Sequence, residues 1–539
     1  MTNYQDDFAA SRLPDTTLQP DFLFDAPEFK LPENLNCSYD LLDKHIVAGK
    51  GQAIALRTFE HTWTYQTLFK KANLIANVLI HELGLVPGNR VVIRSANNPM
   101  FVACWFGIIK AGGIVVATMP LLRAKELNTI VEKAEVSHIL CDERLQDEVN
   151  ALENNFVKQV ITFDGLEKKE SSLEKLMARQ PDTFTNFLSK ASDVAIIGFT
   201  SGTTGNPKMT AHYHRDLVLV CKAYPGTSLQ PVPGDIFTGS PPIGFTFGLG
   251  GLVLFPLYYG ASSFLIEAPG PENLLRAIAM HKITICFTAP TAWRILSSLI
   301  ENYDISSLRK CVSAGEALPP KVFEDWFRAT GLKILDGIGA TELLHIFISS
   351  NDNNVKAGAL GKPVHGYQAM IIDEQGKEVG DGEPGKLAVK GITGCRYLSD
   401  ERQKEYVKAG WNITGDICKK DEEGYFWFVA RNDDMIISSG YNIGAPEVES
   451  VLIMHKDIAE CAVVGIPDEH RGAIVCAYIV LKDKSKSSPD FAKEIQDWFK
   501  KEAAPYKYPR KIIFMDSLPK NVSGKIARFA LNKMQGQVQ

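Results

Sequence analysis

Residues 199–208 read FTSGTTGNPK, and they continue an apolar run, 194–199, that has the composition of a buried strand. Glycines let the backbone approach a phosphate closely, while the hydroxyls and Lys208 supply hydrogen-bond donors and positive charge. The segment is not a Walker A loop, because Asn-Pro precedes the lysine and Met209 follows it, where that motif has Ser or Thr. We therefore expect a strand that leads into a phosphate-binding loop, with an ordinary structural turn as the alternative.

On both sides of this loop, segments with helical periodicity alternate with short β-branched runs, from about residue 52 to residue 360. Helices are predicted over 68–83 and 98–111. Strands are predicted over 90–94, 113–118, 137–141, 159–162, 194–199, 263–266, 283–287 and 332–335. Strands separated by helix-length segments indicate βαβ units, so we expect an α/β fold with mostly parallel sheets.

The pattern changes near residue 361 and again near residue 433. Residues 361–428 contain many glycines, turns and short strands, which predicts a small β-rich subdomain. A compact pattern follows, with helices predicted over 446–454 and 491–502 and strands over 458–465 and 476–481. We therefore expect a large N-terminal domain, 1–432, and a small C-terminal α+β domain, 433–539, joined at the polar segment ARNDDM.

The chain of 539 residues carries 58 Lys and Arg against 63 Asp and Glu, which gives a net charge of −5. This balance argues against a protein that coats nucleic acid or that binds a membrane surface through basic residues. The ten cysteines form no CxxC pair and lie mostly in apolar runs. They predict buried, reduced thiols in a cytoplasmic protein and give no zinc-site spacing.

A run without charged residues separates Asp235 from Glu267 and is long enough to be considered as a membrane span. Glycines and prolines interrupt this run repeatedly, and no basic flank accompanies it. We expect a buried loop–helix–strand unit instead. Its uncharged, partly aromatic surface would suit the wall of an apolar ligand pocket, although plain core is the default.

Three further motifs carry groups that can act on a nucleotide. DGIGATE, residues 336–342, follows a predicted strand and offers a hydroxyl and a carboxylate for phosphate and Mg²⁺, although both groups would also serve as a helix cap. WNITGD ends in Asp416, which suits either ribose hydroxyls or a simple Asx turn. PKNVSGK ends in Lys525, which either reaches a distant site from its glycine turn or remains a solvated surface lysine.

In this chain order, FTSGTTGNPK, DGIGATE, TGD, ARNDDMIISSGYNI and PKNVSGK resemble the adenylate-forming superfamily of acyl-CoA synthetases, luciferases and peptide-synthetase adenylation domains. The resemblance extends from residues 63–65 to Lys525. DGIGATELLHIFISS, VVATMPLLRAKEL, FTAPTAWR and SAGEALP resemble the aryl-CoA ligase branch, which includes benzoate–CoA ligases. PDFLFDAPEF and AHYHRDL resemble 2-aminobenzoate (anthranilate)–CoA ligases most. Two departures leave the reactive groups in place: Ile338 stands where the commonest form has Tyr, and Ala430 where many relatives have Gly.

This resemblance implies an acid–thiol ligase that uses ATP to adenylate an aromatic carboxylate, 2-aminobenzoate or benzoate, and then transfers the aryl group to CoA. The products are aryl-CoA, AMP and pyrophosphate. The resemblance implies ATP and Mg²⁺ as cofactors and CoA as co-substrate. The charge and the cysteines predict a cytoplasmic enzyme without a nucleic-acid or membrane partner. Three alternatives stay open: adenylation for a carrier protein that acts in trans, a short- or medium-chain acyl-CoA synthetase, and a non-catalytic ATP-binding protein. A homodimer stays open as well.

The resemblance also implies a role for individual residues. Phosphate contacts fall to Thr200, Ser201, Gly202, Thr203, Thr204, Gly205, Lys208 and Thr341, and Glu342 ligates Mg²⁺. The adenine is lined by Ser313, Ala314, Gly315, Glu316, Asp336, Gly337 and Ile338, and the ribose is held by Asp416 and Arg431. Lys525 bridges the carboxylate and the α-phosphate, so that the catalytic set is Lys208, Thr341, Glu342 and Lys525. Asp433 is the hinge of a mobile C-terminal lid, whose rotation exchanges Lys525 for a pantetheine-tunnel segment at Gly440.

The candidate acyl-pocket residues share the absence of positive charge, which favours a compact, flat acid over a long fatty chain. They are Phe245, Phe247, Gly248, Ala289, Pro290, Thr291, Ile338, Gly339, His345 and Ile346. His345 stands at helix-like spacing from Glu342, and both a core role and a substrate contact are open for it. His212 and His214, beside the phosphate loop, have no assigned role.

Overall fold

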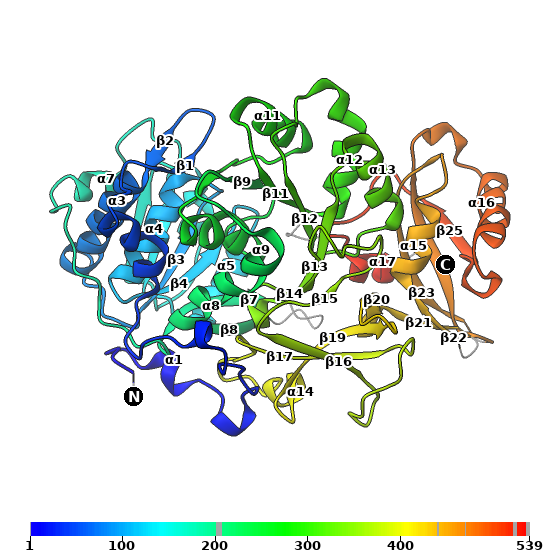
Figure 1. The fold of residues 1–539 in the computed structure, drawn as a ribbon, viewed down its shortest axis with the longest axis horizontal. Coiled ribbons are helices and arrows are strands. Elements are labelled where there is room, and N and C mark those ends of the chain that lie inside the picture. Colours follow the sequence, from blue (N-terminus) through cyan, green and yellow to red (C-terminus); the bar gives the residue numbers. More distant parts are fainter. Residues whose placement is uncertain (1, 201–206, 439–440, 469, 521–524, 535–539) are drawn as a thin grey trace.

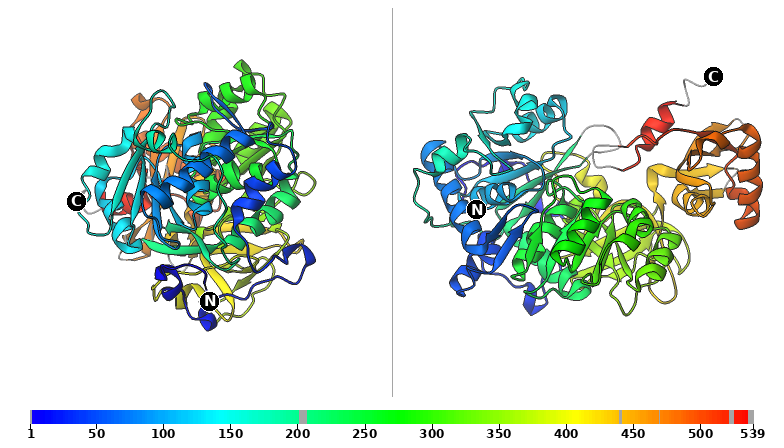
Figure 2. Two further views of the ribbon diagram at one scale, coloured as in Figure 1. Left: turned by 90° about the vertical axis from the view of Figure 1, so that its left-hand side faces the viewer. Right: turned by 90° about the horizontal axis from the view of Figure 1, so that it is seen from above.

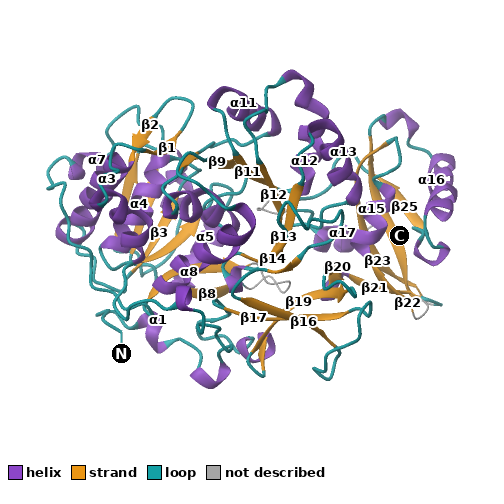
Figure 3. Cartoon of the chain, viewed as in Figure 1, coloured by secondary structure: helices purple, strands orange, loops and turns teal. Residues whose placement is uncertain are grey.

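The computed structural model describes residues 2–200, 207–438, 441–468, 470–520 and 525–534. Figure 1 shows two helix-covered sheets in the N-terminal body, an antiparallel sheet along one side of them, and a fourth sheet formed by the C-terminal residues. Figure 3 shows that helices accompany the parallel sheets, whereas few helices lie on the antiparallel one. This is the α/β class, with a β-rich subdomain and a small C-terminal α+β region, that the sequence predicted.

The phosphate-loop motif belongs to a six-stranded sheet with the order β6-β5-β3-β4-β7-β8. All neighbours are parallel except β7 and β8, which form an antiparallel pair. The strands are β3 (Arg90–Arg94), β4 (Ile114–Thr118), β5 (His138–Asp142), β6 (Gln159–Phe163), β7 (Val194–Thr200) and β8 (Lys208–Tyr213). The helices of this part are α1 (Phe8–Ser11), α2 (Lys44–Val47), α3 (Tyr65–Asn77), α4 (Pro99–Lys110), α5 (Ala124–Ala134), α6 (Gln146–Asn150), α7 (Ser172–Met177) and α8 (His214–Tyr224).

The second large sheet has nine strands in the order β15-β14-β13-β12-β11-β9-β10-β1-β2, with a parallel centre and antiparallel edges. Its strands are β1 (Ile54–Arg57), β2 (Thr62–Thr64), β9 (Ile236–Gly239), β10 (Ser262–Phe264), β11 (Ile285–Thr288), β12 (Lys310–Ala314), β13 (Ile334–Gly339), β14 (Ile346–Ser349) and β15 (Lys362–Pro363). The associated helices are α9 (Thr246–Leu249), α10 (Phe255–Tyr258), α11 (Pro271–His281), α12 (Pro290–Leu299) and α13 (Pro320–Thr330).

One apolar core joins the two large sheets. It contains residues of β3, β4, β11 and β13 together with α3, α4 and α8. The sequence explains the start of α4, because the Asn98 side chain accepts a hydrogen bond from the Phe101 backbone and Pro99 occupies the first helical turn. Every residue of α4 is buried, as expected of a helix that is apolar on all sides.

The charge-free run forms a strand, short helical turns and a second strand. It contains β9, α9, a π-helical turn over Gly250–Leu254, α10 and β10, and the apolar residues of that turn are buried. The sequence had predicted the burial and the final strand but not the initial one. In the part of the chain that the structure describes, no helix is both long and apolar enough to cross a lipid bilayer.

The β-rich subdomain is a five-stranded antiparallel sheet with the order β16-β17-β19-β18 and β20 beside β19. Its elements are β16 (Tyr367–Ile372), β17 (Gly385–Gly391), α14 (Gln403–Tyr406), β18 (Val407–Lys408), β19 (Trp411–Lys420) and β20 (Phe426–Arg431). A single 3-10 turn, Asn432–Asp434, then leads into the C-terminal sheet.

The C-terminal sheet has the order β22-β21-β24-β23, with β25 parallel to β24. Figure 2 shows this sheet standing to one side of the N-terminal body. Its elements are β21 (Met435–Ser438), β22 (Tyr441–Gly444), α15 (Ala445–Leu452), β23 (Ile458–Asp468), β24 (Gly472–Leu481), α16 (Pro489–Glu502), β25 (Lys511–Phe514) and α17 (Arg528–Met534). The sequence did not predict β21, β22 and β25, because strands of four residues give too few alternations to be recognised.

Candidate active site

The phosphate-loop motif is carried by a rigid hairpin. β7 ends at Thr200 and β8 begins at Lys208, and these two residues are direct partners across the antiparallel pair. Both ends of the loop are therefore fixed to one sheet. The predicted phosphate contacts Ser201, Gly202, Thr203, Thr204 and Gly205 lie outside the described residues. The Thr200 hydroxyl is buried and has no hydrogen-bond partner among the residues that are described.

Lys208 lies beside the predicted metal ligand. Its Nζ donates to the Tyr397 hydroxyl at 2.7 Å and stands 3.8 Å from Glu342 Oε1. The same hydroxyl donates a hydrogen bond to Glu342. Burial, followed by the Glu342 charge, raises the pKa of Tyr397 well above its ordinary value, so the phenol keeps its proton. Sequence reasoning missed Tyr397 completely.

His212 holds the turn that carries Thr341 and Glu342. Its Nε2 lies 2.7 Å from the Thr341 carbonyl, so Nε2 carries the proton and donates. Burial lowers the pKa of His212 to about 4, which keeps the ring neutral. Beneath it, the fully buried Asp216 pairs with Arg396 at 2.7 Å. His212, which the sequence left unassigned, thus supports the site. His214, also unassigned, lies elsewhere and forms a hydrogen bond of 3.0 Å with the Tyr4 hydroxyl.

The predicted adenine-lining residues stand on adjacent parallel strands. Ser313 pairs with Asp336, and Ala314 pairs with Gly337, at the carboxyl ends of β12 and β13. Ligands of α/β sheets bind at such strand ends. Burial raises the pKa of Asp336 to about 8. One oxygen of this carboxyl and the Ser313 hydroxyl have no hydrogen-bond partner in the described ranges.

The two predicted ribose-binding residues form an ion pair. Asp416 of β19 and Arg431 of β20 are register partners, and their charged groups are 3.0 Å apart. Asp416 is buried while more than half of the Arg431 side chain is exposed. Burial raises the pKa of Asp416, and the neighbouring guanidinium opposes that rise.

Lys525 of the C-terminal region reaches this site. A Cβ placed on Gly315 would lie 3.4 Å from Lys525 Cε and 3.7 Å from its Nζ. The lysine side chain remains exposed at its surface. Surrounding protein nevertheless removes enough water to lower its pKa, and the carboxylate of Glu316 opposes that shift. The predicted bridging lysine is therefore next to the predicted adenine-lining segment.

A second contact holds the C-terminal sheet in this orientation. Arg294 of α12 donates a hydrogen bond to the Ala459 carbonyl of β23 and lies 3.9 Å from the Glu460 carboxylate. Glu460 also pairs with Lys520 at 3.2 Å, five residues before Lys525.

His345 lies within an aromatic cluster. Its ring centroid is 5.6 Å from that of Phe247 and 4.5 Å from that of Phe255, and Nε2 is 3.4 Å from the Phe247 carbonyl. Burial lowers the pKa of His345 to about 3, so the ring is neutral. Its Nδ1 has no hydrogen-bond partner in the part of the chain that is described.

The spacing of Glu342 and His345 is that of a helix, but the structure forms no α-helix over these residues. Thr341–Leu343 is one 3-10 turn, and Leu344 takes a positive φ of 72° that ends it before β14 begins. The two side chains therefore do not share a helix face.

The other acyl candidates lie in three places. Phe245 precedes α9, which contains Phe247 and Gly248; Ala289 precedes α12, whose first residues are Pro290 and Thr291; Ile338 and Gly339 end β13, and Ile346 begins β14. Phe247 contacts Phe287 of β11, with a ring separation of 5.7 Å, directly before the segment that leads to Ala289. The contact joins two of these places.

Two remaining residues of the prediction concern the C-terminal region. Asp433 stands within the turn between β20 and β21. Gly440 lies outside the described residues.

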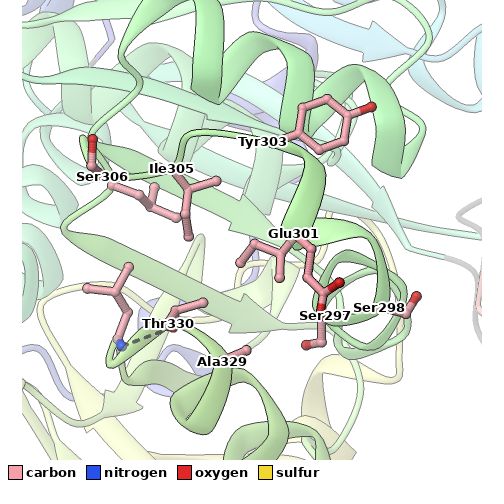
Figure 4. A pocket seen from close by; sticks show the side chains of 11 residues that line it. Ser297, Ser298, Glu301, Tyr303, Ile305, Ser306, Ala329 and Thr330 are labelled. Atoms are coloured by element: carbon pink, nitrogen blue, oxygen red, sulfur yellow. Dashed lines mark hydrogen bonds between the residues drawn. The ribbon is translucent and has the colours of Figure 1, made fainter.

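A cavity of about 670 Å³ is separate from all of these residues. It is lined by the ends of α12 and α13 and by the 3-10 turn after α12, including Ser297, Thr330 and Glu301, and lies at the amino ends of β12 and β13 (Figure 4). It is therefore at the opposite strand ends from Ser313 and Asp336.

The residues fit Mg²⁺ bound together with nucleotide. Among the described residues, no group of three or more His, Cys, Asp or Glu side chains could enclose a metal ion. Magnesium at phosphate sites commonly takes one or two carboxylates, with the remaining ligands coming from phosphate and water. Glu342, next to the phosphate loop, meets that requirement.

Comparison with known proteins identifies the family. The AMP-binding enzyme model matches residues 44–396, and the AMP-binding enzyme C-terminal domain matches residues 447–525. Benzoate–CoA ligase of Thauera aromatica is 33% identical over 523 residues, covering 94% of this chain and 97% of that protein. The mitochondrial acyl-coenzyme A synthetase ACSM3 of Mus musculus is 33% identical over 532 residues, with 94% and 92% covered.

Solved structures of similar enzymes support the same family assignment. The anthranilate CoA ligase AuaEII, in complex with anthranoyl-AMP, has a TM-score of 0.88 and 33% identity, covering 94% of this chain and 98% of that one. A benzoate CoA ligase from Burkholderia xenovorans has a TM-score of 0.84 and 29% identity, with 92% and 99% covered. This chain therefore belongs to the AMP-binding enzyme family and is an adenylate-forming enzyme of the acyl-CoA and aryl-CoA ligase type, a family that uses ATP, Mg²⁺ and CoA.

Proposed function

We propose that this enzyme is an ATP-dependent aryl-CoA ligase whose acid substrate is 2-aminobenzoate or benzoate. The observation that carries the proposal is the placement of Lys525 against Gly315, within one site that also contains the Asp416–Arg431 pair. We propose that the phosphate hairpin, the adenine strands, the ribose pair and the C-terminal region together bind one nucleotide.

In the first half-reaction, a carboxylate oxygen of the acid attacks the α-phosphorus of ATP, and pyrophosphate leaves. Lys208 holds the outer phosphates, and Thr341 contacts the α-phosphate. Lys525 places its ammonium between the two reacting anions, where a mobile point charge reduces their repulsion. Glu342 would hold Mg²⁺, which would supply positive charge to the phosphates.

In the second half-reaction, the CoA thiolate attacks the acyl carbon and AMP leaves with the electrons of the broken bond. The thiol needs access to the acyl carbon after Lys525 has served the first half-reaction. We propose that the C-terminal domain, 433–539, turns about Asp433 relative to the domain 1–432 and replaces Lys525 by the segment at Gly440. Such an alternation is a gating step between two half-reactions.

The surroundings of His345 support a preference for 2-aminobenzoate. Because Nε2 donates to the Phe247 carbonyl, the buried Nδ1 is the acceptor, and it has no partner among the described residues. An aromatic amine would supply the missing donor, whereas benzoate would leave the acceptor unsatisfied. The flat rings of Phe247 and Phe255 beside it suit an aromatic acid.

The substrate assignment is tested by His345→Phe, which keeps an aromatic ring and removes the acceptor. We expect the ratio of kcat/KM for 2-aminobenzoate over benzoate to fall about tenfold. His281→Phe, on α11 and in ring contact with Phe264, is the matched control and should leave the ratio unchanged. A ratio that His345→Phe does not alter would remove this histidine from substrate selection.

The second candidate is a short- or medium-chain acyl-CoA synthetase. It is supported by the 33% identity to the mitochondrial acyl-coenzyme A synthetase, which equals the identity to the benzoate–CoA ligase. Transfer to a carrier protein in place of CoA is the third. Measuring AMP release with CoA and with a carrier protein, for each acid, separates the acceptors.

The ten cysteines are all free and buried, which is compatible with the proposed cytoplasmic location.

A further inference from the structure

Tyr397 is the buried group that contacts two predicted catalytic residues and that no motif accounts for. It lies in GCRYLSD, residues 394–400, between β17 and α14. Only 1% of its surface is exposed. Its hydroxyl accepts from Lys208 at 2.7 Å and donates to Glu342, so that one phenol joins an ammonium to a carboxylate.

The backbone around Tyr397 is fixed to the strand that begins with Lys208. Tyr397 forms a β-bridge with Thr210, and Leu398 N donates to the Met209 carbonyl at 3.0 Å. The Tyr397 backbone N–H also donates to the buried Gln403 side chain at 2.8 Å. The ring is therefore held against β8, with its hydroxyl bonded to both Lys208 and Glu342.

The distance between the charged groups of Lys208 and Glu342 is longer than in a direct, hydrogen-bonded ion pair. Lys208 Nζ and Glu342 Oε1 are 3.8 Å apart, whereas a charge-assisted contact closes to about 2.8 Å. In a site with little water, a direct ammonium–carboxylate pair is strongly attractive. It would have to be broken before the lysine could bind a phosphate and the carboxylate could bind a metal ion.

We propose that Tyr397 is a positioning residue that keeps Lys208 and Glu342 apart and so keeps both available for ATP and Mg²⁺. This inference rests on the proposed function, because it takes the phosphate role of Lys208 and the metal role of Glu342 from it. Removing the hydroxyl lets the two charged groups close on each other, which weakens nucleotide binding without touching the acid pocket.

The test is Tyr397→Phe, which deletes one oxygen atom and keeps the ring. Titration calorimetry with ATP and Mg²⁺ should show a dissociation constant raised about tenfold, since the lost contacts are hydrogen bonds to charged groups. In pyrophosphate exchange, the Mg²⁺ concentration for half-maximal rate should rise while the KM for the aromatic acid stays the same. A general packing defect would change both.

The matched control is Tyr406→Phe. The Tyr406 ring packs edge-on against Tyr397 at 5.6 Å, and its buried hydroxyl has no hydrogen-bond partner among the residues described. We expect wild-type ATP binding and wild-type Mg²⁺ dependence from this variant. Equal losses in both variants would assign the effect to packing and overturn the inference.

A double-variant cycle tests the cause directly. With Mg²⁺ absent, Tyr397→Phe should weaken ATP binding, because Glu342 competes with phosphate for Lys208. In a Glu342→Gln background the competing charge is gone, so the same substitution should have no effect. An undiminished effect in that background, or wild-type affinity of Tyr397→Phe, would contradict the inference. Absence of ATP binding by the wild-type enzyme would instead contradict the proposed function.

Discussion

Gly315, which follows β12, and Lys525 of the C-terminal region lie close together: a Cβ on the glycine would be 3.4 Å from the lysine Cε. A C-terminal side chain is thereby brought to the carboxyl end of the nine-stranded sheet. The proposed role of Lys525 in adenylation requires this orientation of the C-terminal region. The first two predictions test this relationship.

Lys525→Ala should abolish adenylation and spare thioester formation. Loss of a point charge between two anions is expected to slow pyrophosphate exchange by about 100-fold or more. Release of aryl-CoA from supplied aryl-AMP and CoA does not use that charge and should keep its rate. Lys511→Ala, at an exposed position of β25, is the control. Equal loss of both half-reactions would contradict the assigned role.

Arg294→Gln should slow the first half-reaction alone. Its guanidinium joins α12 to β23 through Ala459 and Glu460, so its removal loosens the orientation that places Lys525 in the site. We expect pyrophosphate exchange to fall about fivefold, with thioester formation from aryl-AMP unchanged or faster. Arg328→Gln removes an arginine that is 74% exposed and serves as the comparison. Equal slowing of both half-reactions would rule out an orienting contact.

Gly250→Ala should damage acid binding while ATP binding persists. A Cβ at this position would lie 2.2 Å from His345 Cδ2, so the histidine ring must move. The expected result is a KM for the aromatic acid raised about tenfold, measured with saturating ATP. Gly234→Ala, where a Cβ meets no atom within 4 Å, should behave as wild type. Normal KM in Gly250→Ala would place His345 away from the acid.

Buried neutral histidines should make the enzyme less stable in mild acid. Burial lowers the pKa of His214 to about 3 and that of His212 to about 4. Below about pH 6.5 these histidines therefore bind protons in the unfolded chain but not in the folded chain. The free energy of unfolding decreases as the pH is lowered, by about 1.4 kcal/mol per pH unit for each such histidine. His214→Gln should reduce this slope in urea titrations between about pH 6.5 and 4.5. An unchanged slope would mean that His214 does not titrate in this way.

The fold could be predicted, and the candidate nucleotide-binding residues could be proposed, because their sequence signals are local. FTSGTTGNPK follows its strand directly, and Asp416 and Arg431 become partners through one hairpin. Tyr397 gave no such signal, since a single tyrosine has no spacing and meets Lys208 only across 189 positions. His345 stands at helix-like spacing from Glu342, but the 3-10 turn ends at Leu344, and a leucine side chain gives no signal for the positive φ found there.

The most direct test of the proposed aryl-CoA ligase activity is product formation from a mixture of acids. The enzyme is given ATP, Mg²⁺ and CoA with equal concentrations of benzoate, 2-aminobenzoate, hydroxybenzoates and octanoate, and the CoA thioesters are quantified by mass spectrometry. We predict that an aryl-CoA dominates, with 2-aminobenzoyl-CoA ahead of benzoyl-CoA. Predominance of octanoyl-CoA, or AMP release without any CoA thioester, would contradict the account.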